Sequence, residues 1–118
     1  MTDAYDLFRE GQKRLRTGMT AQATVPLERA KRLEPHKASI REALGIAYFR
    51  LARWQDAERE FRVIVEELAP TDHYAHYALG RALEQLGRTS EANGHYKLAS
   101  SMKPSSETYS SRILDLGG

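Results

Sequence analysis

Apolar residues recur along this chain at intervals of three and four, which is the period of amphipathic helices. The clearest stripe consists of Ile40, Leu44, Ala47, Tyr48 and Leu51. Segments of this kind, separated by glycine, proline or polar residues, predict six helices at about 3–16, 20–34, 38–51, 54–68, 73–86 and 90–102. A seventh, shorter helix is predicted at about 106–116, with Tyr109, Ile113 and Leu116 on its apolar side.

The second of these helices contains a proline, Pro26. A proline inside a helix removes one backbone hydrogen bond and costs about 3 kcal/mol. We therefore expect this helix either to be kinked or to be truncated at Val25. At its start, the hydroxyl of Thr20 is expected to cap the exposed backbone amides.

A set of residue types recurs at intervals of 34 and then 35 residues. Each copy has a glycine, an alanine twelve residues later and a larger residue four positions after the alanine. The copies are Gly11, Ala23 and Leu27, then Gly45, Ala57 and Phe61, then Gly80, Ala92 and Tyr96, with Leu44, Tyr48, Leu79 and Leu83 at flanking apolar positions and Pro35, Pro70 and Pro104 at the ends. Pro70 is displaced by one residue. Self-similarity at this period is typical of stacked helical hairpins.

The repeated residue types have a physical explanation in such a hairpin. Two helices that cross closely need small residues where their backbones approach. The glycine of the first helix is therefore expected to meet the alanine of the second, and the large residue to fill the space toward the next hairpin. The proline ends the unit because it cannot continue a helix.

These residues resemble the tetratricopeptide repeat (TPR), and the resemblance covers nearly the whole chain. It implies an all-α fold, a right-handed superhelix (solenoid) of three helix-turn-helix hairpins with a short C-terminal capping helix. The chain is then a single domain, 1–118, with repeats at about 4–37, 38–72 and 73–105 and the cap at about 106–116. A partly frayed tail is the alternative to the cap, and it would leave the C-terminal end free to form a homodimer.

Composition narrows the class of protein. Hydrophobic residues make up 41% of the chain, and no apolar run approaches the roughly 20 residues that span a bilayer, so no membrane segment is expected. The N-terminus has no basic segment followed by an apolar one, so we expect no secretory signal and a cytoplasmic location. The absence of cysteine excludes disulfides and thiol chemistry.

Charge is nearly balanced, with 18 basic and 16 acidic residues. An excess of +2 is weak support for binding nucleic acid, which we consider unlikely as a partner. The basic residues are concentrated in the first hairpin, where they form either ordinary solvated helix faces or a docking site for an acidic partner.

No set of residues predicts an enzyme, a cofactor or a metal site. His73 and His76 lie three residues apart, but no third ligand accompanies them. We expect His76 to pack at the hairpin interface and His73 to be exposed. The glutamates Glu58, Glu60, Glu66 and Glu67 are interpreted as solvent-facing charges.

In the family that this chain resembles, partner segments lie along the concave surface formed by the first helix of each hairpin. The glycine register assigns fifteen residues to that surface: Tyr5, Phe8, Arg9, Gln12, Arg16, Ser39, Glu42, Ile46, Phe49, Arg50, Tyr74, Tyr77, Arg81, Glu84 and Gln85. Tyrosine and arginine are enriched at binding hot spots, and core packing is not expected to account for the rings at these positions.

The leading hypothesis is therefore a non-enzymatic adaptor that binds a protein or peptide segment with acidic and apolar or aromatic character. TPR domains that clamp chaperone tails use lysines, an arginine and asparagines on this face. Here the corresponding residues are Phe8, Gln12, Ala43, Tyr74 and Ala78, so that role is not expected. Two alternatives stay open: an RNA- or ribosome-associated protein that uses the basic first hairpin, and a self-assembling structural subunit.

Overall fold

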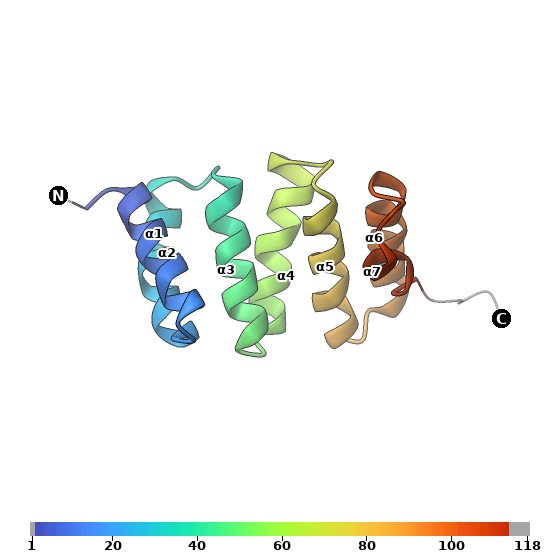
Figure 1. Ribbon diagram of the computed structural model, residues 1–118, viewed down its shortest axis with the longest axis horizontal. Helices are drawn as coiled ribbons and strands as arrows, with labels where there is room; N and C mark the ends of the chain where they lie inside the picture. Colours follow the sequence, from blue (N-terminus) through green and yellow to red (C-terminus); the bar gives the residue numbers. More distant parts are fainter. Residues whose placement is uncertain (1, 114–118) are drawn as a thin grey trace.

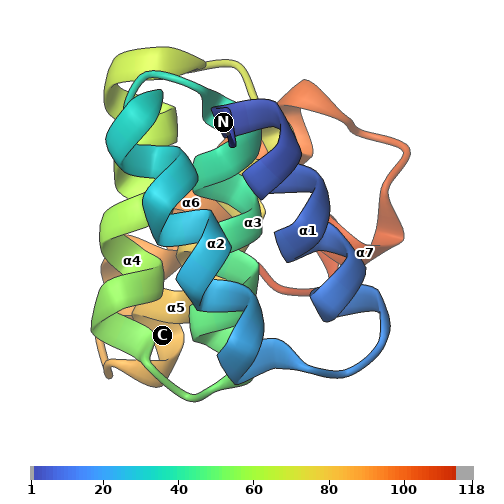
Figure 2. The ribbon, with the colours of Figure 1, turned by 90° about the vertical axis from the view of Figure 1, so that its left-hand side faces the viewer.

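A computed structural model describes residues 2–113, and every regular element within that range is helical. The elements are α1 (Ala4–Arg16), α2 (Thr20–Leu33), α3 (Ala38–Arg50), α4 (Trp54–Val63), the π-helical turn η1 (Ile64–Leu68), α5 (His73–Gln85), α6 (Thr89–Met102) and α7 (Glu107–Ser110). The six long helices predicted from the sequence are confirmed. They form the hairpins α1–α2, α3–α4 and α5–α6, which succeed one another along the long axis (Figure 1). Viewed from the N-terminal end, the hairpins lie one behind another (Figure 2).

The close approach of the two helices in each hairpin depends on glycine. A Cβ atom on Gly45 would lie 2.6 Å from the ring of Phe61, and one on Gly80 would lie 2.5 Å from the ring of Tyr96. Any larger residue would therefore displace a buried ring. Ala57 is fully buried, as expected of the alanine in the pattern, but the atoms nearest to each glycine belong to the larger residue four positions further on.

The turns inside the three hairpins share one backbone conformation. Gly18 has a φ of 80°, Gly87 a φ of 79° and Ala52, at the equivalent position of the second hairpin, a φ of 59°. The left-handed region costs an L-amino acid roughly 1–2 kcal/mol, because Cβ approaches the carbonyl oxygen that follows it. The second hairpin therefore carries local strain that the other two avoid.

The π-helical turn η1 follows α4 directly and accounts for the longer spacing between the second and third repeats. A π-helical turn accommodates an extra residue within a helix. Ala69 closes the turn by donating from its amide to the carbonyl of Ile64. This placement agrees with the shift of Pro70 by one residue from the position of Pro35 and Pro104.

Of the two outcomes expected for α2, truncation at Val25 does not occur, because α2 continues through Pro26 to Leu33. A proline at this position leaves the carbonyl of Gln22 without its helical donor. Arg14 of α1 supplies another donor, since its Nη1 lies 2.9 Å from that carbonyl oxygen. A residue of the neighbouring helix thus compensates for the bond that proline removes.

The start of α2 also differs from expectation. Thr20 is the first helical residue and the N-cap is Met19, whose side chain makes no capping hydrogen bond. Side-chain caps are found at α1, where Asp3 accepts from the amide of Asp6, and at α5, where Asp72 accepts from the amide of Ala75.

The C-terminal helix is shorter than predicted. α7 is a single turn capped by Ser106, and it packs against α6. Tyr109 is buried and Ile113 contacts the main core, so two members of the predicted apolar side cover the last hairpin as expected. The third, Leu116, lies outside the described residues.

Candidate partner-binding groove

The repeat spacing brings the predicted groove residues of α1, α3 and α5 into register. Gln12, Ile46 and Arg81 occupy equivalent positions in successive hairpins, one residue after the glycines that face the second helix. Three hollows follow one another along this face. Phe8 and Ser39 line both the first and the second hollow. Ile46 and Arg50 line both the second and the third. The hollows therefore form one continuous groove.

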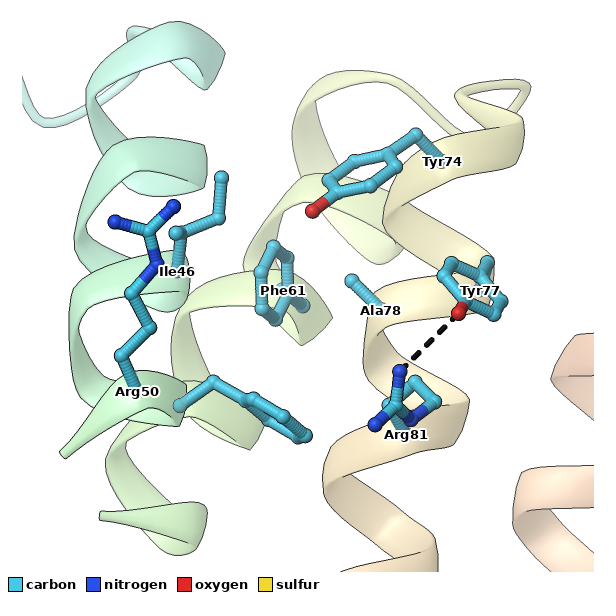
Figure 3. Close-up of a pocket in the computed structure, with 8 residues that line it drawn as sticks. Ile46, Arg50, Phe61, Tyr74, Tyr77, Ala78 and Arg81 are labelled. Atoms are coloured by element: carbon cyan, nitrogen blue, oxygen red, sulfur yellow. Dashed lines mark hydrogen bonds between the residues drawn. The ribbon is translucent and has the colours of Figure 1, made fainter. Parts of the chain in front are cut away.

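The third hollow, which we call the anchor pocket, lies between α3 and α5 and has a volume of about 200 Å³ (Figure 3). Its lining residues are Ile46, Phe49 and Arg50 from α3, Phe61 from α4, and Tyr74, Tyr77, Ala78 and Arg81 from α5. Phe61 lies between the two walls, and the small side chain of Ala78 leaves the space open (Figure 3). The pocket is apolar inside, with arginine on both walls.

The rings of the anchor pocket also support the fold. Phe49, Tyr74 and Tyr77 are partly buried and pack against the main core. The Tyr77 ring lies 5.1 Å from that of Tyr109 and 6.0 Å from that of Tyr96. The expectation that core packing would not account for these rings is therefore wrong. These three rings both pack against the core and line the pocket.

Both arginines of the anchor pocket are held in place by neutral partners. Arg81 donates from Nη1 to the hydroxyl of Tyr77 at 3.2 Å, and its guanidinium lies 5.2 Å from the ring centre of Phe49. Arg50 donates from Nη1 to the carbonyl of Leu15 at 3.3 Å. These contacts fix the side chains without neutralising their charge, so both remain able to attract an anion.

Ion pairing divides the arginines of the molecule into two groups. The basic residues with a carboxylate partner are Arg14, Lys31, Arg41, Arg53, Arg59, Arg62, Arg88 and Arg112. The four arginines predicted for the groove, Arg9, Arg16, Arg50 and Arg81, make no ion pair within residues 2–113. Arg29 and Arg32 of α2, outside the groove, are unpaired in that range as well. The groove is distinguished because its unpaired Arg16, Arg50 and Arg81 line the hollows.

The glutamates of α4 and η1 correct another expectation. Glu58 and Glu60 are buried instead of facing solvent, whereas Glu66 and Glu67 are exposed as predicted. Glu60 is only 4% exposed and lies between Lys31 at 2.8 Å and Arg41 at 3.0 Å. Hydrophobic patterning alone cannot distinguish such a carboxylate from a surface residue, because the compensating cations come from other helices.

The predicted groove residues are not all equally placed. Phe8, Gln12, Arg16, Glu42 and Ile46 line the second hollow, between α1 and α3. Four others lie at the margins, and one of them, Gln85, is exposed and lines none of the three hollows. Tyr5 lines the first hollow and is 63% exposed. Arg9 lies over the ring of Tyr5, at 5.8 Å from its centre, and lines none of the three hollows. Glu84 is also outside them and pairs with Arg112 at 3.7 Å.

Four residues that line the second hollow or the anchor pocket are not among those that the sequence assigns to the groove: Leu15, Ala43, Phe61 and Ala78. The sequence pattern predicts Phe61 only as a core residue, and Ala43 and Ala78 only as replacements for the residues of a chaperone clamp. The available signal for the two alanines was that each directly follows a residue predicted for the concave surface, Glu42 or Tyr77. The signal for Phe61 was its position opposite Gly45, where α3 and α4 approach each other closely and a glycine leaves room for the ring.

Glu42 gives the second hollow a different electrostatic character. Burial raises the pKa of the Glu42 carboxyl, and the charge of Asp72 raises it further. Burial also raises the pKa of the neighbouring Tyr74 hydroxyl, with a smaller contribution from Glu42. Acidic charge thus accumulates near the start of α5, while the unpaired arginines lie further along the helices.

The histidines are engaged in packing. His76 is buried at the hairpin interface as predicted: its Nε2 donates to the carbonyl of Pro70 at 2.8 Å, and its Nδ1 lies 3.0 Å from Nδ1 of His95. His73 is half-buried instead of exposed, because its Nδ1 lies 2.8 Å from the hydroxyl of Tyr109. Within residues 2–113, no group of three or more potential ligands could hold a metal ion. No helix in that range is long and apolar enough to cross a bilayer.

Comparison with known proteins gives one curated relative and several structural neighbours. No family model matches the chain. Over 110 residues the chain is 32% identical to Superkiller complex protein 3 of Mus musculus. This match covers 93% of the chain but 7% of that protein, so the chain corresponds to a small part of its relative.

Among solved structures, the first TPR of Spaghetti (RPAP3), bound to the HSP90 peptide SRMEEVD, has a TM-score of 0.89 at 22% identity, covering 94% of this chain and 87% of that one. The Arabidopsis OM64 TPR domain has a TM-score of 0.88 at 19% identity, covering 93% of this chain and 90% of that one. These similarities concern the fold, including the order and stacking of the hairpins.

Proposed function

Because this chain has the tetratricopeptide-repeat fold, we propose that it is a non-enzymatic adaptor that binds a protein segment in the groove of α1, α3 and α5. The observation that carries this proposal is the position of the unpaired arginines. Most arginines outside the groove are paired with carboxylates, whereas Arg50 and Arg81 have no carboxylate partner within residues 2–113 and flank an open apolar pocket. A partner segment with carboxylates would supply the missing charge.

The size of the anchor pocket favours a side chain over a small-molecule ligand. Pockets for cofactors and drug-sized ligands have volumes of about 300–1,000 Å³. The anchor pocket, at about 200 Å³, is smaller and suits one large apolar side chain of a peptide. Burial of such a side chain contributes about 1.5–3 kcal/mol. Two or three anchors along the groove, after the cost of association, support binding of roughly micromolar strength.

The proposed partner differs from the acidic tail that the Spaghetti (RPAP3) domain holds. At the positions of a chaperone-tail clamp, this chain has Phe8, Gln12, Ala43, Tyr74 and Ala78, which supply neither lysine nor asparagine. Four of these line the second hollow or the anchor pocket with apolar surface. We therefore propose recognition through an apolar anchor with neighbouring acidic residues, and no high-affinity site for the peptide SRMEEVD.

Affinity capture from native lysate tests the proposal. Wild-type protein is compared with a double variant, Tyr77→Ala with Arg50→Ala, and with a control that removes two exposed, unpaired arginines outside the groove, Arg29→Ala with Arg32→Ala. We expect the groove variant to lose partners that the control retains. Identical partner lists for all three proteins would refute groove binding.

A second variant separates binding from folding. Tyr77 also supports the core, so its truncation can lower stability as well as affinity. Ala78→Leu instead places extra atoms in the open pocket while keeping every ring. We expect it to abolish capture while its thermal unfolding midpoint stays close to that of the wild type.

A further inference from the structure

The anchor pocket carries positive charge on two opposite walls. Given the proposed function, on which this inference rests, that arrangement specifies which residue types the bound segment carries. Arg50 extends from α3 and Arg81 from α5, with the apolar opening of the pocket between them (Figure 3). Neither has a carboxylate partner within residues 2–113. An apolar side chain that enters the pocket is thus flanked by a cation on each side.

Both cations are restrained before any ligand binds. Arg81 is held by the Tyr77 hydroxyl at 3.2 Å and by the face of the Phe49 ring. Arg50 is held by the carbonyl of Leu15 at 3.3 Å. An arginine that is already ordered loses less conformational entropy when it pairs with an incoming carboxylate. The two guanidinium groups are therefore prepared to accept anions at separate places.

We propose that the partner segment presents one large apolar residue bracketed by two acidic residues, one toward Arg50 and one toward Arg81. In an extended peptide, side chains two positions apart lie on the same face, about 6.6 Å from each other. Carboxylates two residues before and two residues after the anchor therefore face the same side as the anchor. A single carboxylate can reach only one wall, so one side of the pocket keeps an unpaired charge.

Four capped peptides test this inference on the full chain, with binding followed by amide shifts in NMR titrations. All are seven residues long with a central leucine and serine at the other positions. One has glutamate two positions on each side of the leucine, one has glutamine at both places, and two have one of each. Acetylated and amidated ends remove terminal charges.

We expect the doubly acidic peptide to bind most tightly, and each glutamate-to-glutamine change to raise Kd by about threefold, as for exposed ion pairs. Arg50→Gln should cancel the contribution of one glutamate, and Arg81→Gln that of the other. The control Arg29→Gln should leave all four affinities unchanged. Combining Arg81→Glu with a peptide that carries lysine in place of the corresponding glutamate should restore binding.

Equal affinity of all four peptides would refute recognition of two flanking acidic residues. The same holds if Arg50→Gln and Arg81→Gln both cancel the affinity contributed by the same glutamate. The proposal is also refuted if none of the peptides shifts the amide resonances of groove residues at millimolar concentration. Groove-dependent capture from lysate would still support the adaptor function in each of these cases. Loss of that capture difference, in contrast, would refute the adaptor function itself.

Discussion

Replacing Gly45 with alanine tests the packing on which every hairpin depends. A Cβ atom at this position would lie 2.6, 2.6 and 2.9 Å from three atoms of the Phe61 ring. Carbon atoms in contact prefer separations of about 3.5–4.0 Å, so the ring must move by about 1 Å. It is 1% exposed and lies edge-on to Tyr74 at 6.5 Å, so the shift must disturb this packing or push the ring toward the anchor pocket.

The net effect is the difference of two terms. Alanine stabilises a helix by about 0.8–1.0 kcal/mol relative to glycine. Insertion of a carbon atom into a packed interior costs about 1–3 kcal/mol. Because three contacts are violated and the ring is almost fully buried in the core, the upper part of that range applies. We therefore expect Gly45→Ala to lower the free energy of unfolding by about 1–2 kcal/mol.

The matched control is Gly94→Ala in α6, where no heavy atom lies within 4 Å of the added Cβ. Only the helix propensity term then operates, and stability should rise by about 0.8–1.0 kcal/mol. Urea unfolding followed by far-ultraviolet circular dichroism measures both variants. Equal stability of the two would show that the close approach of Gly45 to Phe61 is not a constraint, and would refute the packing argument.

Three further predictions concern local features of the fold. Ala52→Gly should raise the free energy of unfolding by about 0.5–1 kcal/mol, since it removes the left-handed strain at that turn; unchanged or lower stability in urea would contradict this. Arg14→Ala leaves the carbonyl of Gln22 without a donor and should cost about 1 kcal/mol, measured as a lower thermal midpoint at equal helix content. The pKa of His95 lies below its ordinary 6.5, mainly because of burial and then because of the nearby His76. The free energy of unfolding should therefore be constant above pH 6.5 and fall as the pH drops below it. His95→Gln should flatten this pH profile, as measured by urea unfolding.

The repeat architecture could be predicted because its signal is local and repeated. Gly45 and Gly80, with the large residues that follow them, specify where two helices approach, and the same residue types recur in register. The π-helical turn was also present in the sequence, as the extra residue before Pro70. Its structural form was not inferred, since an inserted residue can be absorbed by a loop as readily as by a helix.

The errors concern features that depend on partners distant in sequence. Of the two outcomes expected at Pro26, truncation does not occur, and Arg14 from another helix bonds the carbonyl that proline leaves free. Glu60 is buried because cations from α2 and α3 surround it. His73 is half-buried because Tyr109 covers it. Amphipathic patterns describe one helix at a time, so they do not report these contacts.

The groove itself follows from the repeat register, but its chemistry does not. The sequence placed rings and arginines on α1, α3 and α5. It did not distinguish Arg81, which is fixed beside an open pocket, from Arg9, which lies over Tyr5 outside the hollows. It predicted that Phe61 fills the space toward the next hairpin, but not that its ring also lines a pocket. These distinctions depend on side-chain conformations and on which cations find a carboxylate.

The most direct test of the groove as the binding surface is site-specific photocrosslinking. A benzophenone amino acid replaces Gln12, which lines the second hollow, or Gln55, which is exposed on α4. Irradiation in native lysate should attach a partner protein through position 12 and none through position 55, and excess Ala78→Leu protein should not compete for that partner. Adducts of equal yield from both positions, or from position 55 alone, would contradict the account.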